Sequence, residues 1–203
     1  MRLLHRICVA AALVAAGPAQ AAGVGVRAGT LGVGGDVAWS VAPALSARVG
    51  YSALTWDRDV STSRVSYNGD LKLSNLNTLL DFSPLGPFRL TGGVIFNRNR
   101  YDVSGDLAGG SLSGTVKPGR SAAPYLGIGY GNVSGLGINF YFDLGVMFQG
   151  SPRASLTANC GSLSASACTS LQNEVAAEQV RLEDELKRFK YYPVANIGIT
   201  IGF

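Results

Sequence analysis

Residues 191–203 read Tyr-Tyr-Pro-Val-Ala-Asn-Ile-Gly-Ile-Thr-Ile-Gly-Phe, and this stretch places two different chemistries on the two faces of one strand. The odd-numbered positions are almost all apolar, whereas the even-numbered positions are mostly small or polar. A period of two residues is typical of a β-strand that lies between two environments. Aromatic residues stand at both ends of the apolar face, and the last one is Phe203. This pattern is the one that a lipid-exposed barrel strand needs.

The same alternation recurs in seven further segments. In residues 136–149 every second side chain is apolar, from Leu136 through Phe142 to Phe148, and the residues between them are mostly polar or small. The other segments alternate over shorter lengths, at residues 24–29, 36–41, 45–52, 75–82, 88–99 and 122–130. Eight such segments predict an all-β protein, an eight-stranded antiparallel up-and-down transmembrane β-barrel.

The connections between these segments differ in length, which predicts their topology. Short turns that contain Gly or Pro lie at residues 42–44, 83–87 and 132–135. Long polar connections lie at residues 57–70, 102–120 and 150–190, whereas the first hairpin, at residues 32–35, is brief. Outer-membrane barrels have short periplasmic turns and longer outer loops. We therefore expect both termini in the periplasm and the long segments outside the cell.

The first residues have the features of a secretory signal. Two arginines precede an apolar run at residues 7–17, and Ala19-Gln20-Ala21 matches a cleavage site. Residues 1–21 are therefore predicted to be a signal peptide, and residues 22–203 the barrel. After this run no uninterrupted apolar stretch reaches the length of about 18 residues that a membrane-spanning helix needs. The predicted location is integral to the outer membrane.

Composition excludes several classes of function. Without residues 1–21 the chain has 15 basic and 13 acidic residues and no basic run, so nucleic acid is not an expected partner. His5, the only histidine, is lost with the signal, which leaves a serine nucleophile without its usual base and a zinc site without imidazole. We expect no enzyme, no metal and no cofactor. Cys160 and Cys168 remain, and an exported pair is more typical of a disulfide than of a metal site.

One amphipathic helix is predicted within the longest connection, at residues 171–189. Thr169 and Gln172 fit a capping box, and Glu183 with Lys187 fits a supporting pair one turn apart. Two interpretations remain open. The helix lies on the barrel rim or on neighbouring loops, or it is a lid or partner-binding element whose start is fixed by a disulfide between Cys160 and Cys168.

Six charged residues fall on the inward faces of the predicted strands. By parity they point away from lipid, where a charge would cost roughly 2 to 4 kcal/mol near the midplane. They are Arg27, Asp36, Arg48, Asp81, Arg89 and Asp143. One interpretation is a selectivity ring. The favoured one is a network of paired charges that fills a narrow interior, because about eight strands leave room for side chains and little else.

These features together resemble the small eight-stranded outer-membrane proteins of Gram-negative bacteria. The group includes the outer membrane protein W family and the transmembrane domain of outer membrane protein A. The resemblance is carried by the alternating segments, above all residues 75–82 and 141–150, and by the strand that ends on Phe203. It implies that Phe203 belongs to a signal read by the barrel assembly machinery. It also implies outer-membrane lipid and lipopolysaccharide as surroundings.

Two functions are expected from this resemblance. The first is a structural barrel or a narrow channel for small solutes. The alternative is a surface-exposed adhesion or interaction protein that acts through its long outer loops, with an unknown surface ligand. A soluble exported β-sandwich is the other fold that the alternation permits.

Overall fold

The computed structural model describes residues 21–62, 65–107 and 110–203. The strands are β1 (Ala22–Gly29), β2 (Gly32–Ala42), β3 (Leu45–Thr62), β4 (Val65–Leu85), β5 (Phe88–Asn97), β6 (Arg100–Leu107), β7 (Gly110–Lys117), β8 (Ala122–Gly131), β9 (Gly137–Met147), β10 (Arg153–Asn159) and β11 (Tyr192–Gly202). Within these ranges the helices are α2 (Ala165–Leu186) and the 3-10 helix η1 (Lys187–Lys190). All strand pairs are antiparallel.

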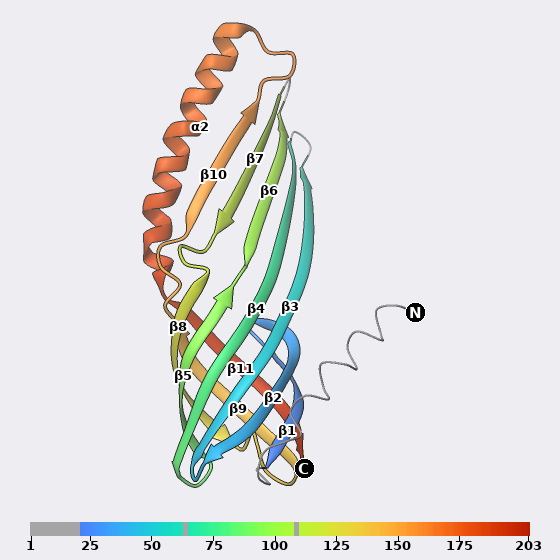
Figure 1. Cartoon of the computed structure of the whole chain (residues 1–203). Coiled ribbons are helices and arrows are strands. Elements are labelled where there is room, and N and C mark those ends of the chain that lie inside the picture. The colour runs from blue at the N-terminus through green and yellow to red at the C-terminus, as the bar shows by residue number, and fades with distance from the viewer. Residues whose placement is uncertain (1–20, 63–64, 108–109) are drawn as a thin grey trace.

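Eight of the strands close into a ring (Figure 1). The pairing runs β1, β2, β3, β4, β5, β8, β9 and β11, and β11 then pairs with β1. The last pairing is continuous, because Val24 faces Ile201 and Ala28 faces Ile197. Backbone bonds between Ala22 and Phe203 extend it by one residue. A closed ring has no free sheet edge along which another chain could pair.

The expected antiparallel all-β fold with one helix is confirmed, but the sheet has 11 strands, not eight. The difference lies in the connections that the sequence predicts as loops. The described residues among 57–70 belong to the long strands β3 and β4. Those among 102–120 include most of β6 and all of β7, and residues 150–190 contain β10. β4 pairs with β5 along residues 75–85 and with β6 along residues 67–72, so one strand has two successive partners within the same sheet.

We call the part beyond the ring the lobe; it comprises the described parts of residues 55–72, 100–117 and 153–190. Figure 1 shows it as a tapering extension of β3 and β4, flanked by β6, β7 and β10 and covered on one side by α2. The connections β2–β3, β4–β5 and β8–β9 lie at the opposite end of the ring, together with the C-terminus (Figure 1). The β4–β5 turn contains Gly86 with φ 58°, a left-handed conformation that glycine adopts without strain. The hairpin between β1 and β2 turns at residues 30–31, not at the predicted residues 32–35, and lies at the lobe end, where the Tyr192 hydroxyl donates to the Thr30 carbonyl.

The helix lies in the expected connection but begins earlier than predicted, at Ala165. Its N-cap is Ser164, whose hydroxyl accepts from the Ala167 amide at 3.4 Å, so the predicted capping box at Thr169 is wrong. Leu156 N donates to Gln179 Oε1 at 3.0 Å, which fixes the helix against β10. Leu171 and Val175 line a groove with Leu156 of β10, so this side of the helix faces the lobe sheet. Among the described residues, no helix combines the length and hydropathy needed to cross a membrane.

The ring has an inverted distribution of side chains, with apolar groups outside. Ile138 is 69% exposed, Phe140 65% and Ile197 62%, whereas the polar positions between them face inward. From Ile138 in β9 to Phe148, the residue after its end, the apolar face covers roughly 26 Å, at about 3.4 Å per residue and a strand tilt of about 40°. That height matches the apolar band of about 25 Å in outer-membrane barrels.

Aromatic pairs mark both borders of this apolar band. Phe88 and Tyr130 meet edge to face at the turn end of the ring, with ring centroids 5.2 Å apart. Phe148 and Tyr191 do the same at the lobe end, at 5.6 Å. Two aromatic girdles around an apolar band are typical of a barrel that lies across a membrane.

Candidate functional site

The centre of the ring is filled by a cluster of two arginines and two aspartates. Arg48 contacts Asp143 at 2.7 Å and Asp81 at 3.1 Å. Arg89 contacts the same two carboxylates, at 2.7 Å and 3.4 Å. Each acid therefore lies between two cations, and none of the four residues is more than 3% exposed. Thr91 completes the shell of Asp81 with a hydrogen bond of 2.6 Å.

A second ion pair lies beside this cluster. Arg27 contacts Asp36 at 3.3 Å and donates to Ser52 at 2.8 Å and to Asn77. Tyr141 joins the two groups: its hydroxyl donates to Asp36. Its ring also faces the guanidinium groups of Arg48 and Arg89, at 5.0 and 5.4 Å from the ring centroid. All six charged residues that the sequence places inside thus meet in one buried network.

Glycines on neighbouring strands provide the space for these side chains. A Cβ at Gly50 would lie 1.8 Å from an Asp36 oxygen, and one at Gly129 would lie 2.6 Å from Arg89 Nη2. A Cβ at Gly198 would lie 2.3 Å from the ring of Tyr141. Because the interior of an eight-stranded ring is narrow, a large side chain on one strand requires a small residue opposite.

An apolar layer lies on the lobe side of the charged network. It consists of Leu31, Leu79, Ile95, Ala123, Tyr125, Met147 and Val194, all of which are buried. Above this layer, Asn97 donates to Gln149 Oε1 at 3.1 Å, and Gln149 donates to the Phe189 carbonyl at 2.9 Å. The interior is therefore filled in successive layers from the charged centre to the lobe.

The apolar layer is not among the sequence predictions. Tyr125, Met147 and Val194 lie on the expected inward faces, but the alternation indicates only a mostly small or polar lining there. Leu79 and Ile95 are each adjacent to an outward apolar residue, which hides the alternation. The available signal is the parity of each strand, which places the layer residues inside with Arg89 and Asp143, except for Leu31, which lies in the turn between β1 and β2.

The remaining predicted residues lie away from the interior. Cys160 and Cys168 are joined by a disulfide, with 5.3 Å between Cα atoms, next to the start of α2 in the lobe. Phe203 lies at the end of β11 and bonds to Ala22 at 2.9 Å through its amide. Its role as an assembly signal stays a prediction. The predicted signal peptide, residues 1–21, lies almost entirely outside the described residues.

In this arrangement the opposite charges bind one another, and neutral polar side chains such as Thr91, Ser52 and Tyr141 add hydrogen bonds to them. Six charges of balanced sign are paired at the centre, and the side chains of the apolar layer next to them are buried. A buried charge is stable only when it is paired in this way. Within the described ranges, no group of three or more His, Cys, Asp or Glu side chains could hold a metal ion.

Known structures with a similar fold include two proteins of Acinetobacter baumannii. The crystal structure of CarO2 superposes with a TM-score of 0.62 at 18% identity and covers 90% of this chain and 98% of its own. That of CarO gives 0.62 at 20% identity, with 89% and 97% covered. A major outer membrane protein from Thermus thermophilus gives 0.41 at 18% identity, with 92% and 100% covered. No family model and no curated protein matches the chain.

At these identities the similarity concerns the fold. The CarO structures have nearly the same extent as this chain, so the likeness includes the lobe as well as the ring. It shows a shared β-barrel fold and does not distinguish the W or A type that the sequence resembles.

Proposed function

We propose that this chain is an integral outer-membrane protein whose ring is a closed structural anchor for the lobe at the cell surface. Residues 1–21 would direct its export, and the turns β2–β3, β4–β5 and β8–β9 would face the periplasm. Support for the membrane location comes from the outward apolar band, which in water would be an exposed patch far larger than soluble monomers carry. The two aromatic girdles at its borders support the same location.

The observation that carries the closed state is the filling of the lumen. A channel for ions or small polar solutes needs a hydrated path, with charges available to the passing solute. Here Arg48 is 0% exposed and Asp143 2% exposed, and each already has two charged partners. The apolar layer around Ile95 and Met147, which are 1% and 0% exposed, closes the path a second time. The first expected function is a structural barrel or a narrow channel, and the filled lumen favours the structural barrel.

Planar bilayer recordings test the closed state. Refolded protein should give no discrete conductance steps, whereas a general porin reconstituted in the same way should conduct. A folded-barrel band on an unheated gel shows that the reconstituted sample has inserted in its native form. Steady small steps from wild-type protein, growing when Arg89 is replaced by Ala, would contradict the proposal and restore the narrow channel.

A second candidate function, surface interaction through the lobe, is favoured by the helix. α2 is 22 residues long and contains no buried residue, so one of its faces is free along its length. This exposed helix face could contact a molecule outside the cell. Deleting residues 154–185 should leave the ring folded and inserted but abolish adhesion of cells that produce the protein. Equal adhesion by both cell types would remove this candidate.

A further inference from the structure

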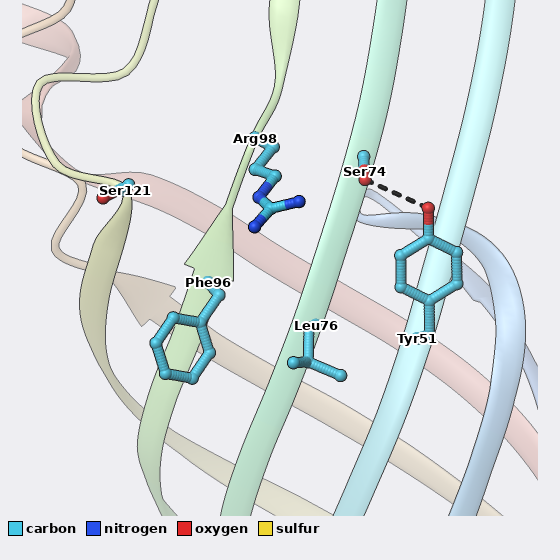
Figure 2. A pocket seen from close by; sticks show the side chains of 6 residues that line it. All are labelled: Tyr51, Ser74, Leu76, Phe96, Arg98 and Ser121. Carbon is cyan, nitrogen blue, oxygen red and sulfur yellow. Dashed lines mark hydrogen bonds between the residues drawn. The ribbon is translucent and has the colours of Figure 1, made fainter. Parts of the chain in front are cut away.

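A groove opens on the outer wall of the ring at the point where the hydrogen-bonding partner of β4 changes from β5 to β6. β5 ends at Asn97 and β6 begins at Arg100, so two residues bridge the point at which the sheet divides. The groove has a volume of about 330 Å³ and is shown in Figure 2. Its lining residues are Tyr51, Ser74, Leu76, Phe96, Arg98 and Ser121. We call it the border groove.

The floor of the border groove is the uppermost row of the apolar band. Tyr51, Leu76 and Phe96 face one another in register across β3, β4 and β5. They are 53%, 41% and 43% exposed. The Tyr51 hydroxyl lies 3.0 Å from that of Ser74, so the phenol is fixed while its ring stays open to the outside. This row offers acyl chains a flat apolar surface at the height of the membrane border.

The roof of the border groove is basic. Figure 2 shows Arg98 above Leu76 and Phe96, with Ser74 on one side and Ser121 on the other. The Arg98 amide bonds to the Ser74 carbonyl at 2.9 Å, which fixes the start of the side chain. Among the side chains that the structure describes, no carboxylate forms an ion pair with this guanidinium.

More cations surround Arg98 in an adjoining groove of about 420 Å³. They are Lys72, Arg100 and Lys117. Arg100 is paired with Asp102 at 2.7 Å, and Lys72 lies 3.8 Å from Asp70 and 3.9 Å from Asp102. Four cations thus face two carboxylates, and the excess positive charge belongs to Arg98 and Lys117.

We propose that the border groove binds the phosphorylated head of an outer-leaflet glycolipid, with its acyl chains on the Tyr51, Leu76 and Phe96 row. Arginine binds phosphate through two parallel hydrogen bonds, and clusters of basic residues next to a membrane attract anionic lipids. A soluble anion would not require the apolar floor, and an uncharged lipid would not require the basic roof. Four cations suit a head with more than one phosphate, as in lipopolysaccharide, better than a single phosphodiester.

The inference rests on the proposed membrane location, and its test keeps the two apart. Refolded protein in detergent micelles is titrated with lipid A that carries two phosphates, and the lipid retained by the protein is measured. Gel migration before and after boiling reports folding of each sample separately. A sample that does not fold in detergent would overturn the membrane proposal, whereas a folded sample tests the groove.

Replacing both Arg98 and Lys117 by Ala should raise the half-saturating lipid concentration about 25-fold, since one membrane-border cation contributes about five-fold. Arg181→Ala, at an exposed arginine of α2 in the lobe, should leave it unchanged. Dephosphorylated lipid A should bind wild type as weakly as the double variant. Unchanged binding by the double variant, or equal binding of the dephosphorylated lipid, would overturn the site.

Two further measurements test the class of ligand. Inorganic phosphate at the same concentration should not displace the lipid, and displacement would indicate a soluble-anion site instead. Phe96→Ala should weaken lipid binding several-fold, whereas Phe140→Ala, which removes an outward aromatic elsewhere on the ring, should not. Equal effects of the two substitutions would remove the acyl-chain part of the proposal.

Discussion

The ring and the lobe share the long strands β3 and β4, yet they treat charge in opposite ways. In the ring, Arg48 and Asp81 are 0% and 1% exposed and lie inside, while Leu80 on the other face is 52% exposed. In the lobe, the pair Arg100 and Asp102 has side chains that are 45% and 26% exposed. The medium around a strand, more than the strand itself, therefore decides which face carries which side chain.

The largest effect is expected from breaking the charged centre. Arg48→Ala leaves two buried carboxylates with one cation between them and should cost about 3 to 5 kcal/mol of unfolding free energy. Arg100→Ala, at the exposed pair of the lobe, should cost at most about 1 kcal/mol. Urea unfolding in micelles, followed by the folded band on a gel, measures both. Similar costs would mean that ring and lobe do not differ in the way described.

The second-largest difference between ring and lobe is expected in the stability cost of an outward-facing lysine. Ile197 in the ring and Val180 in the lobe are almost equally exposed, at 62% and 61%. Ile197→Lys should cost about 2 to 4 kcal/mol in bilayers because it meets hydrocarbon. Val180→Lys should stay within about 0.5 kcal/mol because it meets water. If both lysines were tolerated equally, the outer face of the ring would not be in lipid.

Loss of the disulfide should affect only the lobe. Replacing Cys160 and Cys168 by Ser should cost about 2.5 kcal/mol locally, the loop entropy of a short closed segment. Amide hydrogen exchange should then show faster exchange in the first turns of α2 and unchanged exchange in β9 and β11. Faster exchange in the ring strands would show that the two regions unfold together.

The smallest effect concerns the start of the helix. Ser164→Ala removes the N-cap and should destabilise α2 by about 1 kcal/mol. Thr169→Ala, at the cap expected from the sequence, should be neutral or slightly stabilising, because Thr169 lies within the helix and bonds to the Ala165 carbonyl at 3.0 Å. Circular dichroism on heating measures how much helix each variant keeps, and Ser164→Ala should lose helix at a lower temperature than Thr169→Ala. Earlier loss of helix in Thr169→Ala would indicate that Thr169 is the N-cap, as the sequence predicts.

Sequence patterns are sufficient for the parts of the chain that lie between two media. Outward residues such as Phe140 and Ile199 follow from alternation alone, and the same parity places Arg89 and Asp143 inside. The partners within the lumen do not follow from it, since the contact of Arg48 with Asp143 joins residues 95 positions apart. The register of a closed ring is a property of all its strands together.

The lobe strands escape prediction for a different physical reason. Residues 110–117 of β7 read Gly-Ser-Leu-Ser-Gly-Thr-Val-Lys, with too few apolar side chains to indicate a buried face. Such a strand depends on its neighbours β6 and β10 for its hydrogen bonds. The start of α2, Ala-Ser-Ala-Cys, is likewise without an apolar stripe. Local patterns are weak where an element has few apolar side chains to bury.

The central claim is that the ring has its apolar face in a membrane and its charges shut inside. Fractionation of cells, followed by gel electrophoresis with and without boiling, tests it most directly. The account predicts that the protein stays with the outer membrane, needs detergent for release and changes its migration only on boiling. Processed protein that is dissolved in the periplasmic fraction, monomeric without detergent and unchanged in migration on boiling, would contradict it.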